Sequence, residues 1–116
     1  MAVGTGKSLS ELERSWYQAN SLVATASNTS LSEVKRVYFQ SYLTGELSYT
    51  PAQVHGMGVE ELEKLVLSEW LRIAGKVPGK YLSELWTQQA AQRGSVVGKT
   101  LDETKRNYFS TIAVPF

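Results

Sequence analysis

The chain has 116 residues, a formal net charge of +1, no cysteine and one histidine. Lys and Arg are interspersed with Glu, which argues against binding nucleic acid through a concentrated basic face. The lack of cysteine excludes disulfides and thiolate metal sites. No apolar run reaches the length of a membrane span, and the N-terminus lacks a secretory pattern. We therefore expect a protein that is made in the cytoplasm.

One short segment occurs three times along the chain. Residues 8–18 read SLSELERSWYQ, residues 30–40 read SLSEVKRVYFQ, and residues 100–110 read TLDETKRNYFS. Fainter copies begin at Gly58 and near Tyr81. Internal repetition fixes architecture before single residues are interpreted, so the sequence predicts an array of one short helical module.

Each clear copy begins with a helix start signal, a hydroxyl residue followed three positions later by Glu, which fits a capping box. Apolar residues then recur at helical spacing, and no stretch keeps the alternation of a strand. The expected helices span residues 9–25, 31–43, 59–74, 79–93 and 101–112, with a short turn of helix at 51–55. The predicted fold is all-α, an irregular array of about five short capped amphipathic helices, because the copies are unevenly spaced.

The whole chain, 1–116, is expected to form a single helical domain. Residues 1–7 would be an N-terminal arm, and residues 113–116 a C-terminal tail that cannot continue a helix because it contains Pro115. A helix of about 12–15 residues is marginal alone in water. Each module therefore needs a neighbour to cover its apolar face.

Two stretches imitate a phosphate-binding loop, residues 4–8 (GTGKS) and 98–100 (GKT). The motif needs an earlier Gly and a preceding strand, but Met1 and Arg93 stand where that Gly should be. His55 is the only histidine and Asp102 the only aspartate, whereas metal sites and acid–base catalysis need several such groups together. We expect no catalytic residue, no metal, no cofactor, no small-molecule substrate, and a protein that is not an enzyme.

The repeated Arg and aromatic residues are the candidate interface. Each Arg lies three residues after the capping Glu, so the two can meet on a solvated helix face, or the Arg can dock its module on a neighbouring module or subunit. Adjacent aromatic residues point about 100° apart on a helix, so either both are in the core, or one ring meets an adjoining helix or a partner chain. The candidates are Arg14, Trp16, Tyr17, Arg36, Tyr38, Phe39, Trp70, Trp86, Arg106, Tyr108 and Phe109.

The pattern S-L-x-[DE]-x-x-R-x-[YW]-[YF] is clearest at residues 30–39, and it is accompanied by the stretch EWLRIAGKVPG at 69–79. Together they resemble small minor tail proteins of tailed phages that infect actinobacteria. The resemblance covers most of the chain, and Thr104 departs from it by standing where the other copies have an apolar residue. It implies a virion component near the tail tip, assembled in the host cytoplasm and without enzymatic activity. Its expected partners are other virion structural proteins in an oligomeric assembly.

Two alternatives stay open. A capsid decoration protein or a head–tail connector belongs to the same structural class and fits nearly as well. A small helical DNA-binding regulator belongs to a different class. A DNA reader should gather Lys and Arg on one helix face, whereas each repeated Arg here has a Glu one turn away, so nucleic acid is not the expected partner.

Overall fold

A computed structural model describes residues 7–21 and 29–112 and confirms the all-α fold. Six helices and no strand occur within these two ranges: α1 (Leu9–Asn20), α2 (Leu31–Gly45), α3 (Pro51–His55), α4 (Val59–Ile73), α5 (Leu82–Gln92) and α6 (Leu101–Thr111). Apart from Lys7, the expected N-terminal arm lies outside the described residues. The same holds for the expected tail and for residues 22–25 of the first expected helix.

Two helix boundaries differ from the prediction by three residues or more, for local reasons, and the others agree to within two residues. The first helix was expected to continue past Ser21, but Ser21 has an extended backbone and α1 ends at Asn20. The fifth was expected from residue 79 and begins at Leu82, because the backbone N–H of Tyr81 donates to the Glu84 carboxylate at 3.0 Å and caps the helix there. The N–H of Gly79 instead donates to the Gln88 side chain at 2.6 Å, which holds this residue outside the helix.

The hydroxyl caps expected from the repeats form in all three clear copies. The boxes of Ser8 with Glu11 and of Thr100 with Glu103 are complete. Hydrogen bonds from the Ser8 backbone N–H, and secondarily from its hydroxyl, lower the pKa of Glu11. The Ser30 hydroxyl also accepts the backbone N–H of Glu33. These caps satisfy backbone donors that would otherwise be unpaired at the start of each helix.

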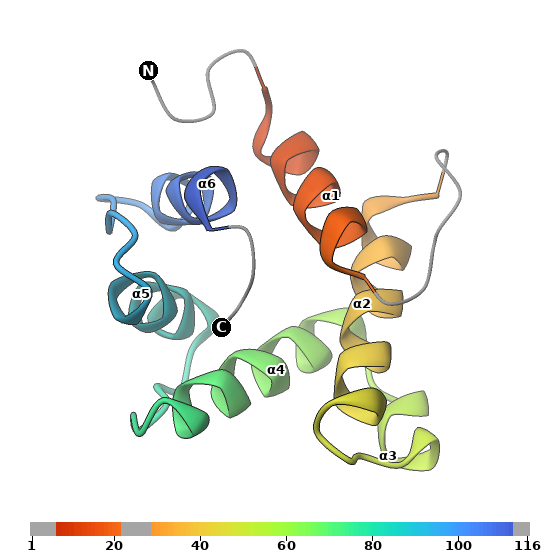
Figure 1. Cartoon of the computed structure of the whole chain (residues 1–116). Helices are drawn as coiled ribbons and strands as arrows, with labels where there is room; N and C mark the ends of the chain where they lie inside the picture. The colour runs from red at the N-terminus through yellow and green to blue at the C-terminus, as the bar shows by residue number, and fades with distance from the viewer. Residues whose placement is uncertain (1–6, 22–28, 113–116) are drawn as a thin grey trace.

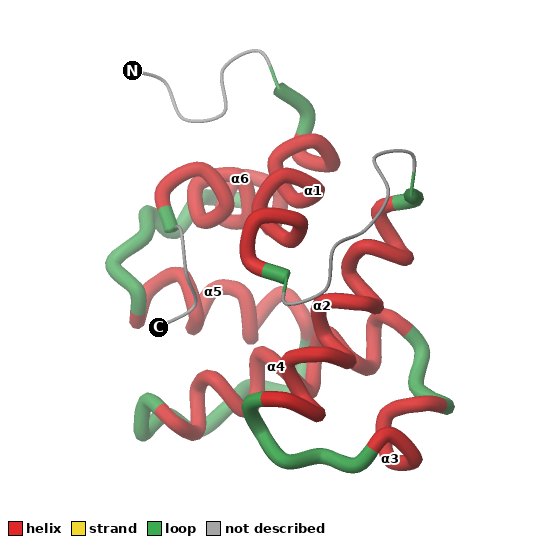
Figure 2. Tube along the Cα trace, turned by 45° about the vertical axis from the view of Figure 1, so that its right-hand side comes forward, coloured by secondary structure: helices red, strands yellow, loops and turns green. Residues whose placement is uncertain are grey.

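Five of the helices form a closed ring. Going around it, α1 packs on α2, α2 on α4, α4 on α5, α5 on α6, and α6 returns to α1 (Figure 1). The short helix α3 packs on α2 and lies outside the ring, as Figure 2 also shows. The molecule is flat, with extents of 42 × 36 × 21 Å.

The five ring helices are the five copies of the module, the two faint ones included. Their N-cap residues are Ser8, Ser30, Gly58, Tyr81 and Thr100. The uneven spacing behind the prediction of an irregular array has a local cause, because α3 is inserted between the second module and the third. The spacing of the copies along the sequence did not predict that the last module, α6, packs on the first, α1.

Equivalent positions of the modules fill the core. The residues four, eight and nine positions after each cap are all buried: Leu12, Val34, Leu62, Leu85 and Thr104; Trp16, Tyr38, Val66, Gln89 and Tyr108; Tyr17, Phe39, Leu67, Ala90 and Phe109. Thr104, the departure from the apolar pattern, is buried with its hydroxyl bonded to the Gly98 N–H at 2.9 Å and the Thr100 carbonyl at 3.0 Å. A polar side chain is tolerated at this position because its hydroxyl is satisfied.

The connections before α5 and α6 share a design that depends on glycine. Gly75 and Gly94 have φ of 80° and 76°, and each ends a helix in the left-handed conformation that glycine favours. Gly98 lies so close to α6 that an added Cβ would stand 2.4 Å from the Cβ of Glu103. The Gly-Lys-Thr stretch at 98–100 is therefore a close approach of backbone to helix followed by a cap.

Replacing Gly98 by Ala should lower the free energy of unfolding by about 1–3 kcal/mol, because the new methyl group overlaps α6. The matched control is Gly56→Ala, where nothing lies within 4 Å of the added Cβ; it should change stability by less than about 1 kcal/mol. Urea unfolding followed by circular dichroism measures both. Equal stability of the two variants would contradict the close packing of this connection.

Candidate functional site

One side chain from every ring helix meets at the centre of the ring. They are the residues five positions after each cap, and together we name them the central network: Glu13, Lys35, Glu63, Trp86 and Lys105. The Lys35 ammonium lies 2.8 Å from the Glu63 carboxylate. The Lys105 ammonium lies 2.8 Å from Glu13 and 3.8 Å from Glu63. The central network therefore ties α1, α2, α4 and α6 together through charge.

Trp86 completes the central network without a charge. Its indole N–H donates to the second carboxylate oxygen of Glu63 at 2.7 Å. The Lys105 ammonium lies 5.4 Å from the centre of the same ring, within the range of a cation–π contact. The glutamates are only 5% and 3% exposed, and burial of this kind is tolerable because each carboxylate has a close cation.

Two buried tyrosines adjoin this centre. Burial raises the pKa of Tyr17 well above its usual value, and the carboxylates of Glu63 and Glu13 raise it further. Its hydroxyl makes no hydrogen bond within the described residues. Burial also raises the pKa of Tyr108 to about 12, opposed by a hydrogen bond from Gln89. Both phenols therefore keep their protons in the folded chain at an alkaline pH of about 10, where an exposed tyrosine begins to lose its proton.

The repeated arginines join consecutive modules around the ring. The Arg36 guanidinium donates to the backbone carbonyl of Met57 at 3.3 Å, and Arg106 donates to the carbonyl of Lys7 at 2.6 Å. Arg14 donates in the same way to the carbonyl of Thr29. Each acceptor is the residue directly before the N-cap of the next helix around the ring, so the arginines dock three of the five modules on their neighbours within one chain.

The arginines were expected to pair with the capping glutamates. All three pairs lie in the described part of the chain, and one of them forms an ion pair. Glu33 and Arg36 lie 3.5 Å apart. The carboxylates of Glu11 and Glu103 instead accept hydrogen bonds from the backbone of their cap residues. Arg14 and Arg106 are then directed at backbone carbonyls of the neighbouring module.

The aromatic residues of the candidate interface lie inside this chain. All eight are 6% exposed or less: Trp16, Tyr17, Tyr38, Phe39, Trp70, Trp86, Tyr108 and Phe109. A ring helix has neighbours on two sides, so two faces about 100° apart are both covered. The Trp16 and Phe109 rings, for example, are 5.5 Å apart across the junction of α1 and α6. Of the alternatives left open by the sequence, the structure places these side chains in the core and against adjoining helices of the same chain, where they are buried.

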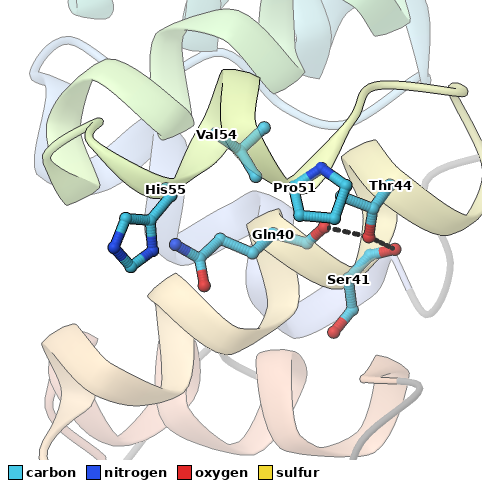
Figure 3. Close-up of a pocket in the computed structure, with 6 residues that line it drawn as sticks. All are labelled: Gln40, Ser41, Thr44, Pro51, Val54 and His55. Carbon is cyan, nitrogen blue, oxygen red and sulfur yellow. Dashed lines mark hydrogen bonds between the residues drawn. The ribbon is translucent and has the colours of Figure 1, made fainter.

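A pocket of about 220 Å³ lies between α2 and α3 (Figure 3), lined by Gln40, Ser41, Thr44, Pro51, Val54 and His55. Gln40 lies between His55 and Ser41, so the imidazole and the serine hydroxyl are not neighbours. The Thr44 hydroxyl is directed at the backbone carbonyl of Gln40 at 2.8 Å. His55 is exposed and is the last residue of α3.

Across the described ranges, no group of three or more His, Asp or Glu side chains is placed to hold a metal ion. Within the same ranges no helix has the length and apolar character needed to cross a bilayer. Comparison of the chain with protein-family models, curated proteins and solved structures gives no match.

Replacing Lys105 by Met should lower the free energy of unfolding by about 3–5 kcal/mol, because it leaves two buried carboxylates without a shared cation. The double variant Glu13→Leu/Lys105→Met should recover much of that loss, since both members of one ion pair are then apolar. The matched control is the exposed Lys99→Met, with an expected change of less than about 0.5 kcal/mol. Urea unfolding of the wild type, the single variants Glu13→Leu and Lys105→Met, and the double variant gives the coupling energy. Additive effects of the two single variants would contradict the pairing.

The free energy of unfolding should begin to fall near pH 10. An unfolded tyrosine loses its proton at about pH 10, whereas the raised pKa values of Tyr17 and Tyr108 keep these groups protonated in the fold. Their contribution to stability is complete below about pH 10 and is lost as the pH rises toward 12. Tyrosinate absorbance and helical circular dichroism should change together for the buried fraction. Completion of the tyrosinate signal before any loss of helix would contradict the burial.

Proposed function

We propose that this chain is a non-enzymatic structural protein of a phage virion, a minor tail protein that docks on other virion subunits. The observation that carries the proposal is that the residues of the repeated motif cap a helix, dock it on its neighbour and fill the core. In the copy at residues 30–39, Ser30 caps α2, Arg36 holds the next module, and Tyr38 and Phe39 are buried in the core. The motif residues therefore serve to assemble helices, and this supports the proposal of a structural protein.

The central network supports the same proposal. Its two carboxylates and two ammonium groups are directed at each other and hold four helices together. Acid–base catalysis requires such groups to face a substrate in a cleft. Here they serve packing, as expected of a structural protein that works through its surface.

We assign contact with other virion subunits to the connections at the two ends of α5. Large apolar side chains are exposed here, namely Ile73, Val77, Tyr81, Val96 and Val97. Large apolar side chains that are exposed to solvent occur at many protein interaction sites. This surface replaces the buried aromatic residues as the candidate for partner contact.

The alternatives within the same class are a capsid decoration protein and a head–tail connector, which would use the same surface at another place in the particle. The DNA-binding regulator is less well supported, because Arg14, Arg36 and Arg106 are already engaged with backbone carbonyls. We therefore retain the minor tail protein as the proposal.

The chain should be present in purified particles and should follow the tail when heads and tails are separated, as measured by quantitative mass spectrometry of the fractions. The variant Val77→Asp/Val96→Asp should fold normally, because these side chains are 86% and 69% exposed. Its incorporation should fall by about tenfold, equivalent to roughly 1.4 kcal/mol of lost contact.

The control for this experiment is Ser32→Asp, at another exposed position, which should be incorporated normally. Recovery with heads would favour the decoration or connector alternatives. Absence from particles, together with binding to duplex DNA in a gel-shift assay, would contradict the virion role and favour the regulator.

A further inference from the structure

The junction that closes the ring joins the two ends of the described chain and repeats the chemistry of an earlier junction. At the junction of α2 and α4, Lys35 pairs with Glu63 at 2.8 Å and Arg36 donates to the carbonyl before the next helix. At the junction of α6 and α1, Lys105 pairs with Glu13 at 2.8 Å. The neighbouring Arg106 again donates to the carbonyl before the next helix, that of Lys7.

Adjacent Lys and Arg residues on one helix therefore bind two features of the next module in the ring. The Lys pairs with a carboxylate five residues after the N-cap, and the Arg donates to the backbone carbonyl just before the N-cap. Between α2 and α4 these features belong to modules that follow each other along the chain. Between α6 and α1 they belong to modules at opposite ends of it. Because α1 and α6 are the first and last helices of the described chain, no short connection holds this copy of α1 beside α6.

We propose that two copies of this chain join by exchanging α1, so that α6 of one copy binds α1 of the other. The partner is a second copy of this chain, recognised by the Glu13 carboxylate and the Lys7 carbonyl. In the exchanged dimer each α1 buries the same residues, among them Trp16 and Tyr17, and each central network keeps its balance of two carboxylates and two ammonium groups.

The exchange is governed by concentration. Because contacts within each ring are the same in both forms, the monomer and the dimer differ mainly in the freedom lost on association. Closure within one chain has the advantage of a high effective concentration. The closed monomer is therefore favoured in dilute solution and the dimer as copies become crowded, as they are in an assembling particle. A second copy of the chain is thus one partner in the proposed structural function. The exchange of α1 itself does not require the assembly to be a phage.

The test uses two full-length variants with opposite defects. Glu13→Lys leaves one carboxylate among three ammonium groups at the ring centre, and Lys105→Glu leaves one ammonium among three carboxylates. Each chain alone carries uncompensated buried charge. When the two are unfolded and refolded together, exchange of α1 restores the native charges in one ring and gives the other a neutral centre with one pair reversed.

The mixture should give a heterodimer of twice the monomer mass by light scattering, enriched roughly tenfold or more over dimers of either variant alone. The control is the double variant Glu13→Lys/Lys105→Glu, whose centre is neutral within one chain and which should gain nothing from mixing. Heterodimer no more abundant than in the separate samples would overturn the proposal.

A second measurement uses the wild-type chain and so does not depend on the folding of the variants. Two isotopically distinguishable preparations, unfolded and refolded together at high concentration, should yield mixed dimers in native mass spectrometry. The absence of mixed dimers would overturn the exchange even if the chain is found in virions. Exchange by a chain that is absent from virions would overturn only the proposed function.

Discussion

The structure depends on the neutralisation of buried charge at a point where five helices meet. Four of the five side chains there are charged, and in ring order their signs run negative at Glu13, positive at Lys35, negative at Glu63 and positive at Lys105. An odd number of positions cannot alternate in sign all the way round. The neutral Trp86 takes the remaining position, between Glu63 and Lys105. Its indole N–H donates a hydrogen bond to Glu63, and its ring faces the ammonium of Lys105. Like charges are thus kept from adjacent positions.

This arrangement gives the modules an order as well as a shape. The core residues of the five copies are alike in character, so apolar packing alone distinguishes poorly between correct and incorrect neighbours. The central network differs between neighbouring helices, because a helix that presents lysine needs one that presents glutamate beside it. We regard it as a hypothesis for this chain that the buried charges specify the order of helices around the ring, a function for which buried polar groups are retained in some proteins. At three of the five junctions, the arginine contacts to backbone carbonyls then fix the position of one helix along the next.

Much of the local structure could be predicted from the sequence, because capping residues and apolar spacing act over a few residues. The helices were anticipated on this basis, and so was the possibility that Arg14, Arg36 and Arg106 dock neighbouring modules. The central network was missed because its column holds Glu, Lys and Trp, and a search for repeated residues looks for similarity, whereas the signal here is opposite charge. The acceptors of the arginines were also hidden, since every residue carries a backbone carbonyl. Ring closure could not be predicted, because it depends on contacts between the two ends of the chain.

The proposals about function also depend on closure of the ring between α1 and α6. It explains why the aromatic residues of the repeats are buried, and it leaves the connections around α5 as the exposed apolar surface. The most direct test is the nuclear Overhauser spectrum of the wild-type chain. The closed ring predicts cross-peaks between the side chains of Trp16 and Phe109, whose rings are 5.5 Å apart although they lie at opposite ends of the sequence. A folded, helical chain that shows no such cross-peaks would contradict the account.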